Sequence, residues 1–261
     1  MTQQAQSHGS RVVFKSKSLT GIMAESYFDL ATPDHFWCRR RFDVLRKLAG
    51  DRLQAASRVG EIGCGNGVLQ LQLEDAYPLA PDGFDLHEGA LRRNMSRRGG
   101  VYCYDINDRA EEFRNVFDVI LMFDVLEHIE DEDRFLQSAR FHLAGRGSLI
   151  INVPALQWLF SAYDEVQGHQ RRYSVSDLAA VARRNGFRVH RITYWGGPLV
   201  PVLALRKVAL TLARTRLDNY AAGFDSKGEL MNAALYAWSR LELIPQRFAG
   251  TSVMAVLEPE S

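Results

Sequence analysis

This sequence has few cysteines, almost no net charge and no long apolar run. The three cysteines, Cys38, Cys64 and Cys103, are odd in number, widely separated and without zinc-ligand spacing, so they fit free thiols in a reducing compartment rather than a disulfide framework. A formal net charge of +1 provides no basic excess, and we expect no nucleic-acid partner. The first ten residues lack the apolar stretch of a signal peptide, and no apolar run approaches the ~18 residues of a spanning helix. We therefore predict a cytoplasmic protein.

Short apolar runs alternate with helical stretches beyond residue 50, which is typical of a parallel sheet flanked by helices. The runs VILMF at 119–123 and SLIINV at 148–153 are almost wholly apolar, as expected of strands buried on both faces. This pattern predicts an α/β fold. Its strands are expected at 58–62, 83–86, 100–104, 117–123, 147–153, 187–195 and 251–257.

Helical patterns precede these strands and fill the segments between them. We expect an amphipathic helix at 27–48, ended by Gly50, after an opening segment without regular structure up to about Lys17. The segment 196–250 is an insertion before the last strand. Its apolar run at 199–212 is interrupted by Arg206 and Lys207, which favours a pair of amphipathic helices over a membrane span. The remaining helices are expected at 69–76, 88–97, 131–144 and 176–184.

A glycine-rich turn, GCGNG at 63–67, follows the first of these predicted strands and precedes a predicted helix. Glycine permits backbone angles that strain other residues and lets a ligand approach the backbone, while the start of the helix offers unpaired amides. A dinucleotide fingerprint would need a glycine where Val68 stands. A nicotinamide-dependent oxidoreductase is therefore the less favoured alternative.

Two acidic residues stand at the carboxyl ends of the next two predicted strands, Asp85 within the first and Asp105 directly after the second. Asp85 lies about twenty residues beyond the glycines, where a carboxylate can accept hydrogen bonds from both hydroxyls of a ribose. Asp105 follows the next strand, where it could accept from the amino group of adenine. Each aspartate alone could simply end a strand or cap a helix. Their order after the glycine turn favours an adenosine-containing ligand.

These motifs together resemble the class I methyltransferases that use S-adenosylmethionine. VGEIGCGNG, FDL, CYDI and FDVILMFDVLEHIED occur in that family's order within residues 58–153. The resemblance implies a Rossmann-like, mostly parallel seven-stranded sheet and S-adenosylmethionine as the cofactor. It places Gly63, Cys64 and Gly65 at the methionine portion, Asp85 at the ribose, Asp105 with Ile106 at adenine, and Phe123 or Asp124 near the amino group of the donor. With neighbouring positions, the implied cofactor-binding set is Trp37, Glu61, Gly63, Cys64, Gly65, Asp85, Leu86, Asp105, Ile106, Phe123 and Asp124.

Segments outside this core resemble one bacterial subgroup of the family. HFWCRRR resembles its aromatic helix over the cofactor, with Trp37 and Arg41 at the matching positions, while GHQRRYS and PQRFAGTSVMAV resemble a downstream motif and its closing strand. The resemblance implies a division into a tail and cofactor-covering helix, a cofactor-binding core, a helical insertion acting as lid or acceptor pocket, and a closing strand. These parts correspond to residues 1–50, 51–195, 196–250 and 251–261.

The candidate catalytic residues are His169, His128, Arg172 and Tyr173. A histidine is the natural proton acceptor if the methyl group is transferred to a hydroxyl. Arg171 or Arg172 could hold a carboxylate or phosphate of the acceptor. The alternatives are that His169 binds loop backbone, that one arginine pairs with Asp164 or Glu165, and that Tyr173 anchors the core.

A metal site is a further hypothesis at the same place. Asp124, Glu127 and His128 share one face if a helix has begun there, and His169 could complete a set of ligands. Similar stretches in ubiquinone-pathway O-methyltransferases and small-RNA methyltransferases imply a divalent metal. We favour the alternative that Glu127 and His128 cap and pack the start of a helix, and we predict no metal.

The sequence is thus interpreted as an S-adenosylmethionine-dependent methyltransferase with a small-molecule acceptor, methylated at oxygen. The other hypotheses are the oxidoreductase and a non-catalytic binding protein that keeps the methyltransferase fold. The insertion could cover the acceptor, form an oligomer contact or extra core, or contact lipid peripherally. The sequence does not define the acceptor or the oligomeric state.

Overall fold

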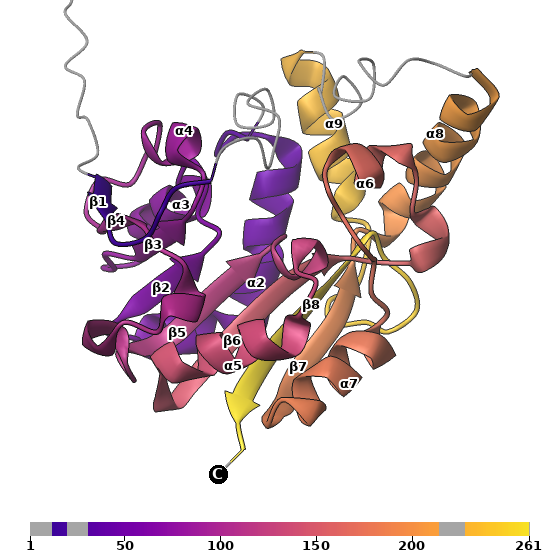
Figure 1. Cartoon of the computed structure of the whole chain (residues 1–261). Coiled ribbons are helices and arrows are strands. Elements are labelled where there is room, and N and C mark those ends of the chain that lie inside the picture. The colour runs from indigo at the N-terminus through magenta and orange to yellow at the C-terminus, as the bar shows by residue number, and fades with distance from the viewer. Residues whose placement is uncertain (1–11, 20–30, 214–227, 261) are drawn as a thin grey trace, which may run out of the picture.

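An eight-stranded sheet organises the chain in the computed structural model, which describes residues 12–19, 31–213 and 228–260 (Figure 1). The strand order is β1-β4-β3-β2-β5-β6-β8-β7, and β8 alone runs in the opposite direction to the other strands. The predicted Rossmann-like, mostly parallel sheet is confirmed. The strands are β1 Val12–Phe14, β2 Val59–Ile62, β3 Asp82–Asp85, β4 Val101–Cys103, β5 Phe117–Phe123, β6 Leu143–Pro154, β7 Phe187–Trp195 and β8 Ser252–Pro259.

Strand β1 is the one strand that the sequence analysis missed. Val12–Phe14 pairs in parallel with β4, with Val12 opposite Val101. The expectation of no regular structure up to Lys17 is therefore wrong for this stretch. Three residues are too few to show alternation, although β-branched and aromatic side chains favour strands. The sheet consequently has eight strands instead of seven.

The helices largely follow the predicted pattern, with two differences in length. The first described helix begins at Phe36 and runs to Ala55, but its backbone is not helical at Ala49 (φ −136°, ψ +16°), so two helical stretches meet at a kink beside Gly50, where the prediction placed the end. Leu48 and Leu53, on either side of the kink, are both buried in the core. Residues 27–30 of the prediction lie outside the described ranges. The helices are α2 Phe36–Ala55, α3 Val68–Ala76, α4 Glu88–Leu91, α5 Glu132–His142, α6 Ala162–Val166, α7 Val175–Arg184, α8 Val200–Ala213 and α9 Glu229–Ser239.

Helix α4 is much shorter than the predicted 88–97. The buried carboxylate of Glu74 accepts hydrogen bonds from the backbone amides of Arg97, Arg98 and Gly99. The Glu74 carboxylate therefore holds the end of the predicted helix in a loop. The three amides that donate to it cannot also donate to the carbonyls of a continuing helix.

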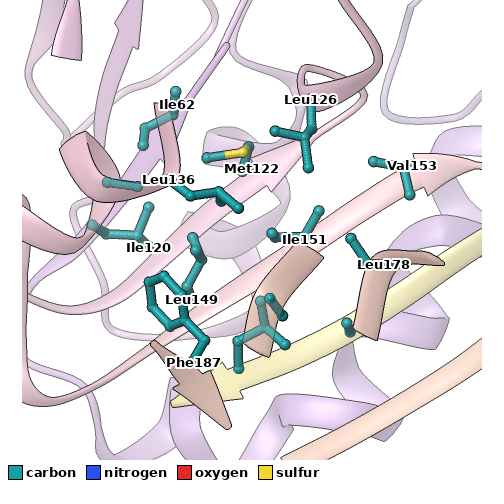
Figure 2. Close-up of a cluster of buried hydrophobic side chains, with 14 of the residues drawn as sticks. Ile62, Ile120, Met122, Leu126, Leu136, Leu149, Ile151, Val153, Leu178 and Phe187 are labelled. Carbon is teal, nitrogen blue, oxygen red and sulfur yellow. The ribbon is translucent and has the colours of Figure 1, made fainter. Parts of the chain in front are cut away.

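Helices cover both faces of the sheet. Along β5, Ile120 and Met122 join the core that includes residues of α5 and α7, whereas Leu121 joins the core on the other face with residues of α2 and α3. Figure 2 shows the first core, where Leu136 and Leu178 lie over the strands. Because both faces are covered, the central strands are apolar at nearly every position, as predicted.

The strand order reverses at β2, which lies between β3 and β5. In open α/β sheets, ligands bind beyond the carboxyl ends of the strands at such a point. Helices α6, α8 and α9 gather beyond the carboxyl ends of β6 and β7 (Figure 1). Among the helices that the structure describes, none has the length and apolar character needed to cross a bilayer.

Candidate active site

A cavity of about 340 Å³ lies at the carboxyl ends of β2, β3 and β5. It extends from the glycine turn to helix α8, which lies in the insertion. The structure brings together all the residues that the resemblance assigns to the cofactor. The predicted residues that line it are Trp37, Glu61, Gly63, Cys64, Gly65, Asp85, Leu86, Asp105, Ile106, Phe123, Asp124, Glu127, His128, His169 and Arg172.

The glycine turn after β2 keeps its end of the cavity open. Gly63 has a φ of +75°, and a Cβ there would lie 2.2 Å from Val125 Cγ2. Gly67 has a φ of +77° and precedes the first turn of α3. A Cβ at Gly67 would lie 2.5 Å from Asn94 Oδ1, so both positions need glycine for backbone conformation and for space. The turn has no side chain at these two positions, and both of their amides donate to backbone carbonyls within the fold.

Asp85 holds the glycine turn in place. Its Oδ2 accepts a hydrogen bond from Gly65 N and its Oδ1 from His87 N, each at 2.8 Å. Burial raises the pKa of the Asp85 carboxyl. A carboxylate oxygen has two acceptor sites, so each oxygen can still accept from a ligand hydroxyl. Asp105 also lines the cavity, and its Oδ1 caps the short helix that follows by accepting from Asn107 N at 2.8 Å.

Asp124, at the end of β5, is held on two sides. Arg41 Nη1 lies 2.6 Å from Asp124 Oδ2, and Asn152 Nδ2 donates to Asp124 Oδ1 at 2.7 Å. Its φ of +56° is uncommon for a residue other than glycine, and these partners stabilise it. Trp195 Nε1 donates to Asn152 Oδ1, and the Trp195 ring lies 4.5 Å from that of Trp37. Helix α2 is thereby fixed against the ends of β5 and β7.

Asn152 was not among the predicted site residues, although a signal for it exists. It is the one amide in the otherwise apolar run at 148–153, and it is fully buried. A buried amide needs hydrogen-bond partners, and here it receives them from Trp195 and Asp124. A polar residue inside a buried strand therefore indicated a link between distant parts of the chain.

His169 lines the cavity beside a buried carboxylate. Its Nδ1 is 2.9 Å from Asp164 Oδ1, and Asp164 also accepts from Arg172 Nε at 2.8 Å. The hydrogen bond to Asp164 fixes the ring and leaves Nε2 directed elsewhere, 4.0 Å from Glu127 Oε1. The alternative in which His169 binds only loop backbone is thus wrong, and the pairing of one arginine with Asp164 is confirmed for Arg172.

Glu127, His128 and His169 bring potential ligand atoms within 4.8 Å of one another. Glu127 is fully buried, and neither of its carboxylate oxygens has a hydrogen-bond partner in the described part of the chain. Burial raises the pKa of Glu127 and lowers that of His128 to about 4, so His128 is neutral at pH 7. The Glu127 side chain therefore does not cap a helix, so the capping part of the favoured alternative is wrong, whereas the complete burial of Glu127 agrees with its packing part. Asp124 stays outside the cluster because Arg41 and Asn152 hold it.

Two of the other candidates lie away from the cavity. Tyr173 is 2% exposed, and its hydroxyl donates to Glu132 and to Leu126 O. It anchors the core and is withdrawn as a catalytic candidate, because its hydroxyl is used within the fold. Arg171 Nη1 forms an ion pair with Glu132 Oε1 at 3.0 Å and does not line the cavity.

A family model described as a methyltransferase domain matches residues 34–192, more than half of the chain. The chain belongs to the methyltransferase domain family. The ubiquinone biosynthesis O-methyltransferase of Rickettsia canadensis (strain McKiel) is 28% identical over 101 residues, which are 35% of this chain and 40% of that protein. The corresponding protein of Rickettsia felis (strain ATCC VR-1525 / URRWXCal2) is also 28% identical over 101 residues, which are 35% of this chain and 39% of that protein. The match thus spans about two fifths of the length of these curated relatives.

Solved structures show the same fold at low identity. A SAM-dependent methyltransferase from Archaeoglobus fulgidus aligns with a TM-score of 0.53 and 16% identity, covering 85% of this methyltransferase and 95% of that chain. Phosphoethanolamine N-methyltransferase 2 of Haemonchus contortus, in complex with S-adenosyl-L-methionine, aligns with a TM-score of 0.55 and 19% identity, covering 86% of this chain and 53% of that one. These likenesses support the methyltransferase fold.

The insertion contributes residues of this methyltransferase that the sequence analysis did not place in a site. Leu203, Arg206 and Lys207 of α8 line the cavity. The Arg206 guanidinium lies 4.7 Å from the centre of the Tyr163 ring, and Lys207 Nζ donates to Trp158 O at 2.6 Å. The signal was the pair of cations in the apolar run at 199–212. Positive charge in the cavity wall is therefore supplied by α8 as well as by Arg172.

Glu61→Gln is expected to stabilise the ligand-free methyltransferase, increasingly so as the pH rises from 5 to 8. Burial raises the pKa of Glu61 from 4.5 to about 8, so the folded chain retains a proton that the unfolded chain releases in this range. Ionisation of Glu61 consequently costs folding free energy, at most about 5 kcal/mol above pH 8. Urea unfolding at pH 5.5 and 8.5 measures the difference. Glu111→Gln, at an exposed position, is the control, and equal pH dependence of all three proteins would contradict the effect.

Proposed function

We propose that this protein transfers the methyl group of S-adenosylmethionine to an oxygen atom of a small-molecule acceptor. One observation carries the proposal. A single cavity joins the glycine turn and Asp85 to the cluster of Glu127, His128 and His169. The end with the glycine turn has the features of a nucleoside site, and the end with the cluster has groups that can accept a proton. The O-methyltransferase names of the curated relatives support oxygen as the methylated atom.

The residues at the first end fit the methyl donor. Gly63 and Gly65 line the cavity without side chains, and Asp85 retains acceptor capacity for two ribose hydroxyls. Glu61 is buried beside the turn, with an Oε2 that lacks a partner among the described residues. A positively charged ligand would satisfy this carboxyl and favour its ionised form. The donor supplies a methyl group on a positively charged sulfur, which leaves as a neutral thioether.

The chain's own contribution is alignment and exclusion of water. In-line transfer needs the acceptor oxygen close to the methyl carbon, and a closed pocket supplies much of the acceleration. Trp37, Phe123 and Leu203 give the cavity apolar walls between its two ends. When the carbon–oxygen bond forms, the acceptor hydroxyl must lose its proton. His169 Nε2 lies at the acceptor end, with Asp164 fixing the other ring nitrogen.

We further propose that Glu127, His128 and His169 hold a divalent cation at the acceptor end. Two imidazoles and one carboxylate suit first-row divalent metals, and a partner carboxylate such as Asp164 commonly orients a histidine ligand. The fit rests on Glu127, whose buried oxygens lack partners in the described ranges, and on the neutral state of His128. A cation there would lower the pKa of an acceptor hydroxyl bound to it. Arg172 keeps Asp164 charged and in place.

Calorimetric titration with S-adenosylhomocysteine tests the proposed function. We expect a dissociation constant of about 1–100 μM, that is roughly −8 to −5 kcal/mol, and no comparable binding of NAD or NADP. Incubation with labelled S-adenosylmethionine and a metabolite extract, followed by mass spectrometry, should show label on a methyl ether or ester. Binding of NAD in place of S-adenosylhomocysteine would support the oxidoreductase alternative. Tight S-adenosylhomocysteine binding without any labelled product would support the non-catalytic alternative.

A further inference from the structure

Helix α9 carries its large apolar side chains on the side that faces away from the fold. Asn232 accepts from Phe36 N at 2.8 Å and the Tyr236 hydroxyl donates to Asp43 at 2.6 Å, so polar residues of α9 face α2. On the outer side, Leu230 is 89% exposed and Trp238 is 51% exposed. A surface helix normally buries its apolar face and exposes its polar one. The arrangement in α9 is the reverse.

Helix α8 has the same reversed arrangement. Arg206 and Lys207 line the cavity on its inner side, whereas Leu205 is 71% exposed on its outer side. The two helices meet where Trp238 Nε1 donates to Pro198 O, directly before α8 begins. Both helices project from the same end of the molecule (Figure 1). We define the insertion face as Val202, Leu205, Val208, Leu230, Met231 and Trp238.

Exposed apolar side chains are concentrated around this face. Nine of the fourteen large hydrophobic side chains that are exposed in the described ranges lie between residues 202 and 248. Six of these nine lie on α8 and α9 and form the insertion face. Single exposed hydrophobic residues are common, but six on two neighbouring helices are typical of a binding surface.

The charge of the insertion favours an anionic partner. Residues 196–250 contain seven Lys or Arg and four Asp or Glu, although the whole chain has a net charge of only +1. One of the four acids, Glu242, is buried in an ion pair with Arg40 at 2.8 Å. Arg240, by contrast, is exposed directly after α9. Two copies of such a surface would repel each other, whereas a bilayer with anionic headgroups would attract it.

We infer that the insertion face docks on the surface of an anionic lipid bilayer. Its apolar side chains enter the boundary between headgroups and acyl chains, and the exposed Arg240 beside the face contacts the headgroups. Because the inner side of α8 lines the cavity, docking places the acceptor end beside the bilayer. An amphiphilic acceptor can then pass from the membrane along α8 to His169. This last step rests on the proposed function, whereas the docking itself does not.

Vesicle flotation with the full chain tests the inference. Vesicles of phosphatidylcholine alone are compared with vesicles that also contain about one third phosphatidylglycerol, at low and high salt. We expect at least tenfold stronger partition to the anionic vesicles, weakened by salt. The double variant Leu205→Gln, Leu230→Gln should lose at least tenfold of this partition. The matched control is Phe14→Gln, which changes an exposed apolar residue of β1 and should partition like the wild type.

Each variant is also titrated with S-adenosylhomocysteine and analysed by sedimentation velocity. Unchanged S-adenosylhomocysteine affinity in the double variant shows that the loss of partition is not a loss of folding. Absence of wild-type partition to either vesicle type would overturn the inference, as would equal loss in the Phe14→Gln control. A wild-type dimer that the double variant converts to a monomer, without vesicle binding, would assign the face to a second copy of the chain. Vesicle binding without S-adenosylhomocysteine binding would refute the proposed function and leave the docking supported.

Discussion

Asp85→Ala is expected to weaken the binding of S-adenosylhomocysteine by about 100-fold or more. Asp85 lines the cavity, and its two oxygens are already oriented by Gly65 N and His87 N. Two ribose hydroxyls bound to one charged carboxylate account for roughly 3 kcal/mol, since hydrogen bonds to charged groups contribute about 1.5–3 kcal/mol each. The substitution also frees the glycine turn from its contact with the side chain. Calorimetric titration measures the change in affinity.

Asp82→Ala is the matched control for this experiment. Asp82 begins the same strand, β3, and its oxygens also accept two hydrogen bonds, from Gly100 N and from Arg58. It lies at the opposite end of the strand and does not line the cavity. The control variant should lose a similar number of hydrogen bonds and keep S-adenosylhomocysteine affinity within about threefold of the wild type. Equal losses in both variants would mean that Asp85 acts only through the stability of β3.

The cofactor end could be predicted from the sequence because its signals are local. The glycine turn and Asp105 follow strands and Asp85 ends one, and parallel strands bring their carboxyl ends together without further information. The capping box of Ser174 and Asp177 and the positive φ of Gly186 likewise define the two ends of α7 within a few residues of sequence.

The features that sequence analysis missed depend on contacts between distant residues. Arg41 and Asp124 are 83 positions apart, and Trp195 reaches Asn152 across 43 positions. The Glu74 carboxylate accepts a hydrogen bond from Arg97 N, 23 positions further along the chain, and this contact holds the segment after α4 in a loop. The type of a side chain shows that it can form such a contact, but it does not identify the partner. For the same reason Tyr173 could be a site residue or a core anchor until its hydrogen bond to Glu132 was known.

His169→Ala is expected to lower the rate of methyl transfer by roughly 10²–10³-fold, while S-adenosylhomocysteine affinity stays within about threefold. His169 lies at the acceptor end with its ring fixed by Asp164, and the cofactor residues are at the other end of the cavity. Loss of either a ligand for the cation or a proton acceptor would affect the chemical step more than donor binding. His190→Ala, at a partly exposed position on β7, is the matched control and should retain full activity.

Glu127→Gln and a chelator separate the two roles open to His169. Glu127→Gln keeps the shape of a buried side chain whose oxygens lack partners in the described ranges, but removes its negative charge. If the cluster holds a cation, calorimetry should show Mn²⁺ or Zn²⁺ binding to the wild type and at least tenfold weaker binding to Glu127→Gln. Because burial raises the pKa of Glu127, the cation must displace a proton, and its affinity should increase with pH. Activity lost on chelation should return with the cation. A stripped wild type with full activity, beside an inactive His169→Ala, would refute the cation and leave His169 as the proton acceptor.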